Sequence, residues 1–203
     1  MRNAIKIPLI LIAAAFGLLL LLAGAGAFYY FSTTQLKITD ADRALIVGPA
    51  EIKPYFDNYT PMLDAVSYHK LKYIDGQVEL KMEYDVEQDN QPYMSVVITD
   101  SRSKADVMSN YLIAWNAMVA VFNAFDTKYD IVEDNSVLKI GDHSRFAYIK
   151  YEDTMVGNMF LFVSGNKLYE FTMTGYYIES ADIWRKLFND KAKQLVAFNK
   201  LDP

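Results

Sequence analysis

A stretch without a single charged residue extends from Ile7 to Phe31, and it limits what the amino-terminal part of this chain can become. About 20 mostly apolar residues suffice to cross a hydrocarbon core roughly 30 Å thick, so the stretch predicts one transmembrane helix. Arg2 and Lys6 precede it and an aromatic cluster closes it, which predicts a cytoplasmic amino terminus and an extracytoplasmic remainder. Membrane lipid, contacted through residues 7–31, is therefore the first expected partner.

A cleaved secretory signal peptide is the alternative for the same segment. Both Ala23-Gly24-Ala25 and Ala25-Gly26-Ala27 resemble a cleavage site, and positive charge before an apolar core is typical of signal peptides. The apolar run from Ile7 to Leu22 is longer than the usual signal core of roughly 7 to 15 residues, which favours a retained anchor. The chain contains no cysteine, so no lipid can be attached through one.

The rest of the chain is acidic. The formal net charge is −5, and all 25 acidic residues follow residue 31. Nucleic acids and anionic lipid surfaces bind clustered cations, so this balance predicts no nucleic-acid partner. An extracytoplasmic domain without disulfides must be stabilised by packing, which points to a bacterial envelope protein. We expect an anchor in the bacterial inner membrane at 1–31, a spacer at 32–50 and one periplasmic domain at 51–203.

Strict alternation of apolar and charged residues predicts a half-buried strand from Gln77 to Val86. A β-rich run from Val66 to Ile74 precedes it, and Asp75-Gly76 between them is the preferred pair for a two-residue hairpin turn. Tyr93 to Thr99 is expected to add a third, more buried strand. These segments predict an antiparallel meander.

The periodicity changes after Ser103, which is expected to cap a helix that ends near Phe125. Apolar residues recur at helical spacing along one side, and between Tyr111 and Phe125 only Asn116 and Asn123 are strongly polar. A helix that is apolar nearly all round needs cover on more than one side. Packing between the sheet and loops is one interpretation, and docking of part of this surface on a partner or on the membrane is the other.

Short β-rich runs return after residue 126, and a last helix follows them. The expected strands are 128–133, 137–140, 145–151, 156–163 and 167–174. Ser180 and Asp182 begin the last helix, whose apolar residues from Trp184 to Phe198 lie on one side. This order of elements predicts an α+β fold, in which an antiparallel sheet is covered by two main helices and preceded by one transmembrane helix.

The carboxy-terminal half contains four characteristic phrases, namely Arg145-Phe-Ala-Tyr-Ile-Lys-Tyr, Met159-Phe-Leu-Phe-Val, Asn166-Lys-Leu-Tyr-Glu-Phe-Thr-Met-Thr-Gly and Leu195-Val-Ala-Phe. By these phrases and by the order of elements, residues 93–198 resemble PsbP-like domains. The resemblance implies an α/β/α sandwich and a family whose members mostly bind or support larger assemblies without catalysis. No site residue is transferred, because no position matches a metal or partner motif of that family.

Few residues of the folded domain suit catalysis or metal binding. Of the two histidines, His69 is expected on a strand surface, whereas Asp142-His143 with Glu152 or Asp153 would form at best a loose metal site. Ser164 lacks the flanking residues of a nucleophile elbow, and the glycine motifs that bind dinucleotides or phosphates do not occur. We therefore predict a protein that is not an enzyme, with no catalytic residue, metal or cofactor.

The function predicted from these features is a binding or accessory module, a subunit or assembly factor that contacts another membrane or envelope protein. Aromatic and apolar side chains would make the contact, and the candidates are Tyr111, Trp115, Met118, Phe122, Tyr176 and Tyr177. Two alternatives stay open: an envelope hydrolase or metal-dependent enzyme that uses His143, and a cell-wall sugar-binding module that uses exposed tyrosines.

Overall fold

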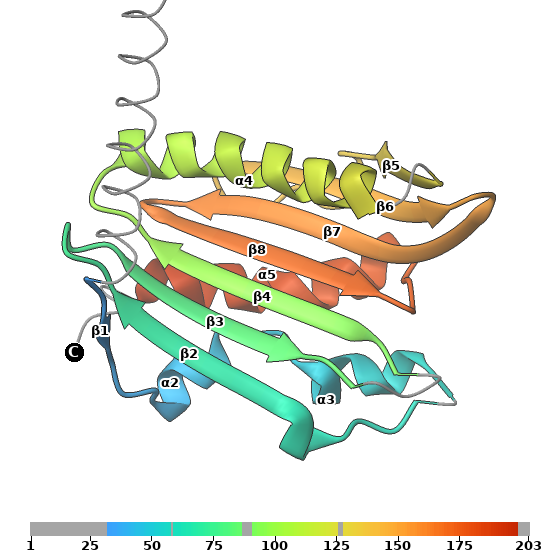
Figure 1. Ribbon diagram of the computed structural model, residues 1–203, viewed down its shortest axis with the longest axis horizontal. Helices are drawn as coiled ribbons and strands as arrows, with labels where there is room; N and C mark the ends of the chain where they lie inside the picture. Colours follow the sequence, from blue (N-terminus) through green and yellow to red (C-terminus); the bar gives the residue numbers. More distant parts are fainter. Residues whose placement is uncertain (1–31, 58, 87–90, 126–127, 199–203) are drawn as a thin grey trace, which may run out of the picture.

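The fold is built on one antiparallel sheet of eight strands (Figure 1). The computed structural model describes residues 32–57, 59–86, 91–125 and 128–198. In spatial order the strands are β1-β2-β3-β4-β8-β7-β6-β5. Their bounds are Thr34–Gln35 (β1), Val66–Lys72 (β2), Val78–Tyr84 (β3), Tyr93–Asp100 (β4), Tyr129–Glu133 (β5), His143–Tyr151 (β6), Thr154–Ser164 (β7) and Lys167–Thr174 (β8).

Two meanders meet in the middle of this sheet. Strands β2 to β4 pair in chain order, and so do β5 to β8. Strands β4 and β8 join the two meanders as antiparallel partners, from Tyr93 opposite Thr174 to Asp100 opposite Lys167. Helix α4 (Lys104–Phe125) leads from the central strand β4 to the edge strand β5, and it crosses one face of the sheet on the way (Figure 1).

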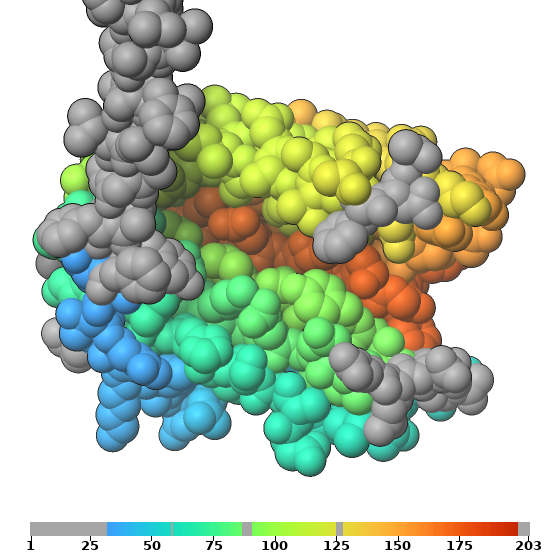
Figure 2. Space-filling view, viewed as in Figure 1, coloured from blue at the N-terminus to red at the C-terminus, as the bar shows by residue number. Residues whose placement is uncertain are grey.

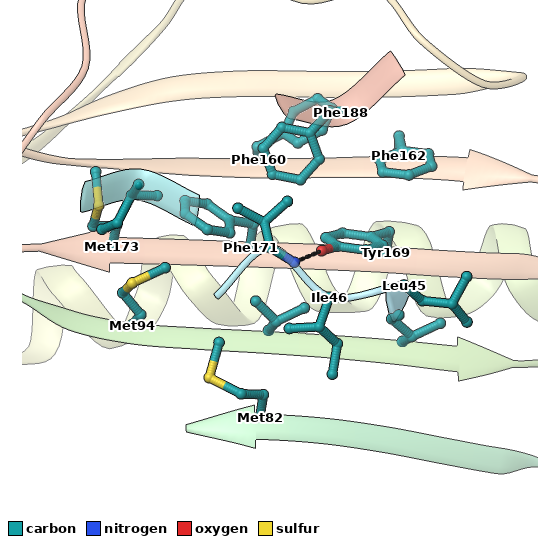
Figure 3. Close-up of a cluster of buried hydrophobic side chains, with 14 of the residues drawn as sticks. Leu45, Ile46, Met82, Met94, Phe160, Phe162, Tyr169, Phe171, Met173 and Phe188 are labelled. Atoms are coloured by element: carbon teal, nitrogen blue, oxygen red, sulfur yellow. Dashed lines mark hydrogen bonds between the residues drawn. The ribbon is translucent and has the colours of Figure 1, made fainter. Parts of the chain in front are cut away.

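The opposite face of the sheet carries the larger apolar core. In β3 the even-numbered apolar side chains are buried and the odd-numbered charged ones are half-buried, as the alternation predicts. Aromatic side chains of β7 and β8 meet helix α5 (Ala181–Ala197) on this face, where the ring centroids of Phe160 and Phe188 lie 5.2 Å apart (Figure 3). Trp184, one turn before Phe188, is fully buried in the same cluster.

The segment expected to be a spacer contributes to this core. Thr39 caps α2 (Asp40–Ala44) through a capping box with Asp42, and residues 45–47 after the helix are buried. The backbone N–H of Val47 donates a hydrogen bond of 3.0 Å to the hydroxyl of Tyr169, drawn in Figure 3. Three short helical segments then lead into β2, and they are α3 (Pro49–Ile52), η1 (Lys53–Tyr55) and η2 (Leu63–Ala65).

The predicted fold class is wrong. Two main helices do not cover the sheet, because α4 packs only on the half formed by β5 to β8, and α5 shares the other face with α2, α3 and nearby loops. Nor does any helix in the four described ranges combine the length and the apolar run that crossing a membrane requires, so the predicted transmembrane helix is not found. The stretch that suggested it, residues 7–31, lies outside the described residues. The inner-membrane location rested on that stretch and stays a prediction.

One of the predicted strands is not formed. Residues 137–140 make no strand, although Val137 and Leu138 are buried in the main core. The carbonyl of Leu138 accepts a hydrogen bond of 3.2 Å from the Ser144 hydroxyl, and Gly141 then turns the chain with a φ of +67°. A loop that covers a core needs apolar side chains just as a strand does, which explains the wrong prediction.

Candidate ligand-binding pocket

A pocket of about 760 Å³ lies between helix α4 and the sheet. In Figure 2 it is visible as a hollow below α4, with β8 at its base and β4 along its lower rim. Its walls are Ala114, Ala117, Met118, Val121 and Phe122 from α4, Tyr129 from β5, Tyr93 and Ser95 from β4, and Glu170, Thr172 and Thr174 from β8. The lining is therefore apolar on the helix side and mixed on the sheet side.

The hollow arises because α4 packs closely on strands β6 to β8 but not on β4. Val107, Tyr111 and Trp115 are spaced by four residues, and all three are buried against β6, β7 and β8. On the side that faces β4, the helix carries Ala114 and Ala117, whose methyl groups are too short to fill the space. Short hydroxyl side chains on the sheet leave this space open.

Trp115 fixes the position of the helix. Its indole N–H donates to the Glu133 carboxylate at 3.2 Å, and the Arg145 guanidinium lies 4.5 Å above the indole ring centroid. Arg145 in turn pairs with Glu133 at 3.0 Å. This arrangement joins α4 to β5 and β6, so the wall of the pocket is held by a hydrogen bond, an ion pair and a cation–π contact.

Glu170 is the charged residue among the described residues that line the pocket. Its cross-strand neighbours on the same face are Val97 of β4 and Leu161 of β7, both apolar. Within the described part of the chain, its carboxyl group has no hydrogen bond or ion pair. Burial, and secondarily the charge of Glu79, raise the pKa of Glu170 to about 7. The group therefore keeps its proton to a higher pH than an exposed glutamate does.

The six candidate contact residues from the sequence do not form one surface. All four candidates from α4 point toward the sheet: Tyr111 and Trp115 are buried against it, whereas Met118 and Phe122 line the pocket. The remaining two lie elsewhere: Tyr176 packs in the main core on the other face of the sheet, and Tyr177 next to it is 40% exposed. Their role in binding a partner stays a prediction.

The residues considered for a metal site are far apart. His143 begins β6, whereas Glu152 and Asp153 follow its other end, and their carboxylates pair with Lys128 at 2.6 Å and Lys150 at 3.3 Å. Among the residues that the structure describes, no three His, Asp or Glu side chains lie close enough together to hold a metal ion. His69 is exposed on β2, as expected from its place in the strand.

Sequence reasoning missed Glu170 and the small residues of α4. A signal for Glu170 exists, because it is the one charged residue between Leu168 and Thr174 in a strand with apolar neighbours. The pairing of β4 with β8 brings this residue beneath α4, and that pairing cannot be deduced from local patterns. No family model, curated protein or solved structure matches the chain, so the resemblance to PsbP-like domains stays untested.

Proposed function

We propose that this protein is a binding module that holds an apolar small molecule in the pocket between α4 and the sheet. The observation that carries the proposal is the lining of that pocket, which is apolar along α4 and has a few polar groups on its floor. Ligand sites in proteins are typically concave, apolar and roughly 300 to 1,000 Å³ in volume, with a small number of polar groups that fix orientation. The pocket of about 760 Å³ fits this description.

The lining residues have distinct parts in such binding. Met118 and Phe122 offer a flexible and a rigid apolar surface, and Phe122 is supported by Tyr129, whose ring centroid lies 5.6 Å away. Thr172 and Thr174 present hydroxyl groups from the floor that can accept or donate hydrogen bonds. A bound molecule would thus lie along the helix and be oriented by the strand.

Binding suits this pocket better than catalysis. Its described lining holds one carboxyl group, two phenols and three aliphatic hydroxyls, and no histidine or lysine that could activate a hydroxyl. The expectation that the protein is not an enzyme therefore remains part of the proposal.

A neutral fluorescent probe tests the proposal directly. N-phenyl-1-naphthylamine should bind the full chain with enhanced fluorescence, and Ala117→Phe should weaken binding at least about tenfold by filling the pocket. Ala120→Phe is the matched control, because Ala120 is exposed on the same helix and does not line the pocket. Circular dichroism should show that both variants keep their helix content. Equal affinity of the probe for both variants and for the unchanged protein would then refute the proposal.

A second proposal keeps the predicted role as an accessory module of another protein. Its specific support is the outer side of α4, where Leu112 is 54% and Ile113 is 63% exposed. Contiguous apolar patches of several hundred Å² mark contact surfaces, and we propose that these two side chains belong to one. A partner that co-purifies with the unchanged chain should be lost from the Leu112→Lys, Ile113→Lys double variant, and retention of that partner would exclude this surface.

A further inference from the structure

The charge of the pocket narrows the chemical class of its ligand. Glu170 is the one charged residue of the described lining, and its carboxyl group faces a space bounded by apolar and hydroxyl side chains. Val97 and Leu161 flank it in the sheet. The cations directly beyond them on the same face, Lys81 of β3 and Arg145 of β6, are paired with Glu83 and Glu133. Glu170 is half-buried, and a carboxylate held beside apolar groups without a partner loses part of its hydration. A ligand with a positive charge would compensate for that loss.

The groups around Glu170 reinforce this preference. From β3, Glu79, Lys81 and Glu83 share its face of the sheet, and Lys81 is paired with Glu83 at 2.7 Å. The phenols of Tyr93 on β4 and Tyr129 on β5 line the pocket, and the lining residues of α4 are all uncharged. No lysine or arginine is among the described lining residues, so an anionic ligand would meet only like charge there.

We propose that the ligand is a cationic amphiphile, a molecule with an apolar chain or ring system and one protonated amine that pairs with Glu170. This inference rests on the proposed function and adds the class of ligand to it. The apolar part would lie along Met118 and Phe122, and the aromatic faces of Tyr93 and Tyr129 are suited to the cation as well. Charge complementarity and hydrophobic contact then act at opposite ends of one molecule.

Proton exchange should accompany this binding. With a pKa raised to about 7, Glu170 must lose its proton before it can pair with a cation below that pH. The apparent affinity for an amine should therefore weaken about tenfold from pH 6 to pH 5, while the affinity for a neutral ligand should not change. Calorimetry at pH 6 in buffers of different ionisation enthalpy should show release of a proton on binding of the amine.

A matched series of ten-carbon ligands tests the inference, with the full chain and concentrations below micelle formation. Decylamine, decanol and decanoate share one chain and differ in charge. At pH 8 the concentration of decylamine that displaces half of the bound N-phenyl-1-naphthylamine should be at least about tenfold lower than that of decanol. Decanoate should require the highest concentration of the three. Glu170→Gln should abolish the advantage of the amine, whereas Glu179→Gln, the same charge change at an exposed loop position, should preserve it.

The possible results separate this inference from the proposed function. Equal advantage of decylamine in the unchanged protein and in Glu170→Gln, or tighter binding of decanoate than of decylamine, would overturn the inference. If decanol still binds in those cases and Ala117→Phe still blocks its binding, the proposed function is kept and only the ligand class is rejected. If no ligand is sensitive to Ala117→Phe, both are refuted. Binding of amphiphiles only elsewhere on the chain would be the same in all variants and would therefore count against both proposals.

Discussion

Glu170 combines two properties that rarely occur together in a central strand. It is ionisable, and its neighbours Val97 and Leu161 offer it neither a hydrogen bond nor a counter-charge. A position chosen for stability alone would carry an apolar residue or a threonine, as at Thr172 two residues further along β8. Strongly perturbed carboxyl groups in pockets are candidates for function, and this is the physical reason for placing the ligand charge there.

The stability of the protein should reveal the shifted pKa of Glu170. The folded state holds this proton up to about pH 7, whereas in the unfolded chain the group has its ordinary pKa of 4.5. The contribution of this group to the free energy of unfolding should therefore be fully present below the unfolded pKa. It should be lost as the pH rises through about 7, and it amounts to at most about 3 kcal/mol. Glu170→Gln should remove that part of the pH dependence.

Urea unfolding at about pH 5 and pH 8 measures the effect as a difference between proteins. The unchanged chain should lose more stability between the two pH values than Glu170→Gln, and Glu179→Gln should behave like the unchanged chain. Parallel losses in the unchanged chain and Glu170→Gln would show that the carboxyl group titrates normally, and they would remove the basis for proton-linked binding.

Helix α4 shows how far periodicity alone can predict an element. Its bounds follow from the capping residue and the spacing of apolar residues, and the structure confirms a helix over 104–125. The apolar side chains of the helix lie in three different environments. Those around Trp115 pack on the sheet, those around Met118 line the pocket, and Leu112 and Ile113 are exposed. The sequence does not distinguish these, because all three look alike until the position of the helix on the sheet is known.

The segment 32–50 illustrates the opposite case. Its polar composition predicts a spacer, yet an ion pair docks it on the sheet. Asp42 of α2 is fully buried and pairs with Lys70 of β2 at 3.0 Å, and Lys70 is only 3% exposed. The same carboxylate also accepts hydrogen bonds from the backbone and hydroxyl of Thr39. Two charged residues that become buried together cannot be recognised one at a time in a sequence.

Removing one member of this ion pair should detach α2 from β2. Lys70→Met leaves the buried Asp42 carboxylate without its cation and should lower the free energy of unfolding by about 3 to 5 kcal/mol. The Asp42→Asn, Lys70→Met double variant should lose clearly less, because no uncompensated charge remains. Lys193→Met is the control, since Lys193 pairs with Asp190 at the surface with both side chains more than three-quarters exposed. Urea midpoints that are the same for Lys70→Met and Lys193→Met would contradict this account.

One sheet forms the framework of the described part of the chain, and its two halves are covered differently on the α4 face. On the α4 face, the β5 to β8 half is packed under the helix, while the charged residues of β3 are half-buried on the other half. Local patterns predicted the antiparallel meanders and the helix between them. They did not predict that β4 pairs with β8, because pairing between distant segments depends on the complete core. The pocket lies over these two paired strands, so it could not be predicted either.

Methionine methyl groups allow the central claim, that an apolar ligand enters beside α4, to be tested in one experiment. Met118 lines the pocket, whereas Met82, Met94 and Met173 are buried in the core on the opposite face of the sheet. In the full chain with labelled methionine methyl groups, titration with decanol should shift the Met118 resonance, assigned through Met118→Leu, and leave the other three in place. Shifts confined to the opposite face, or a Met118 resonance that does not move at saturation, would contradict the account.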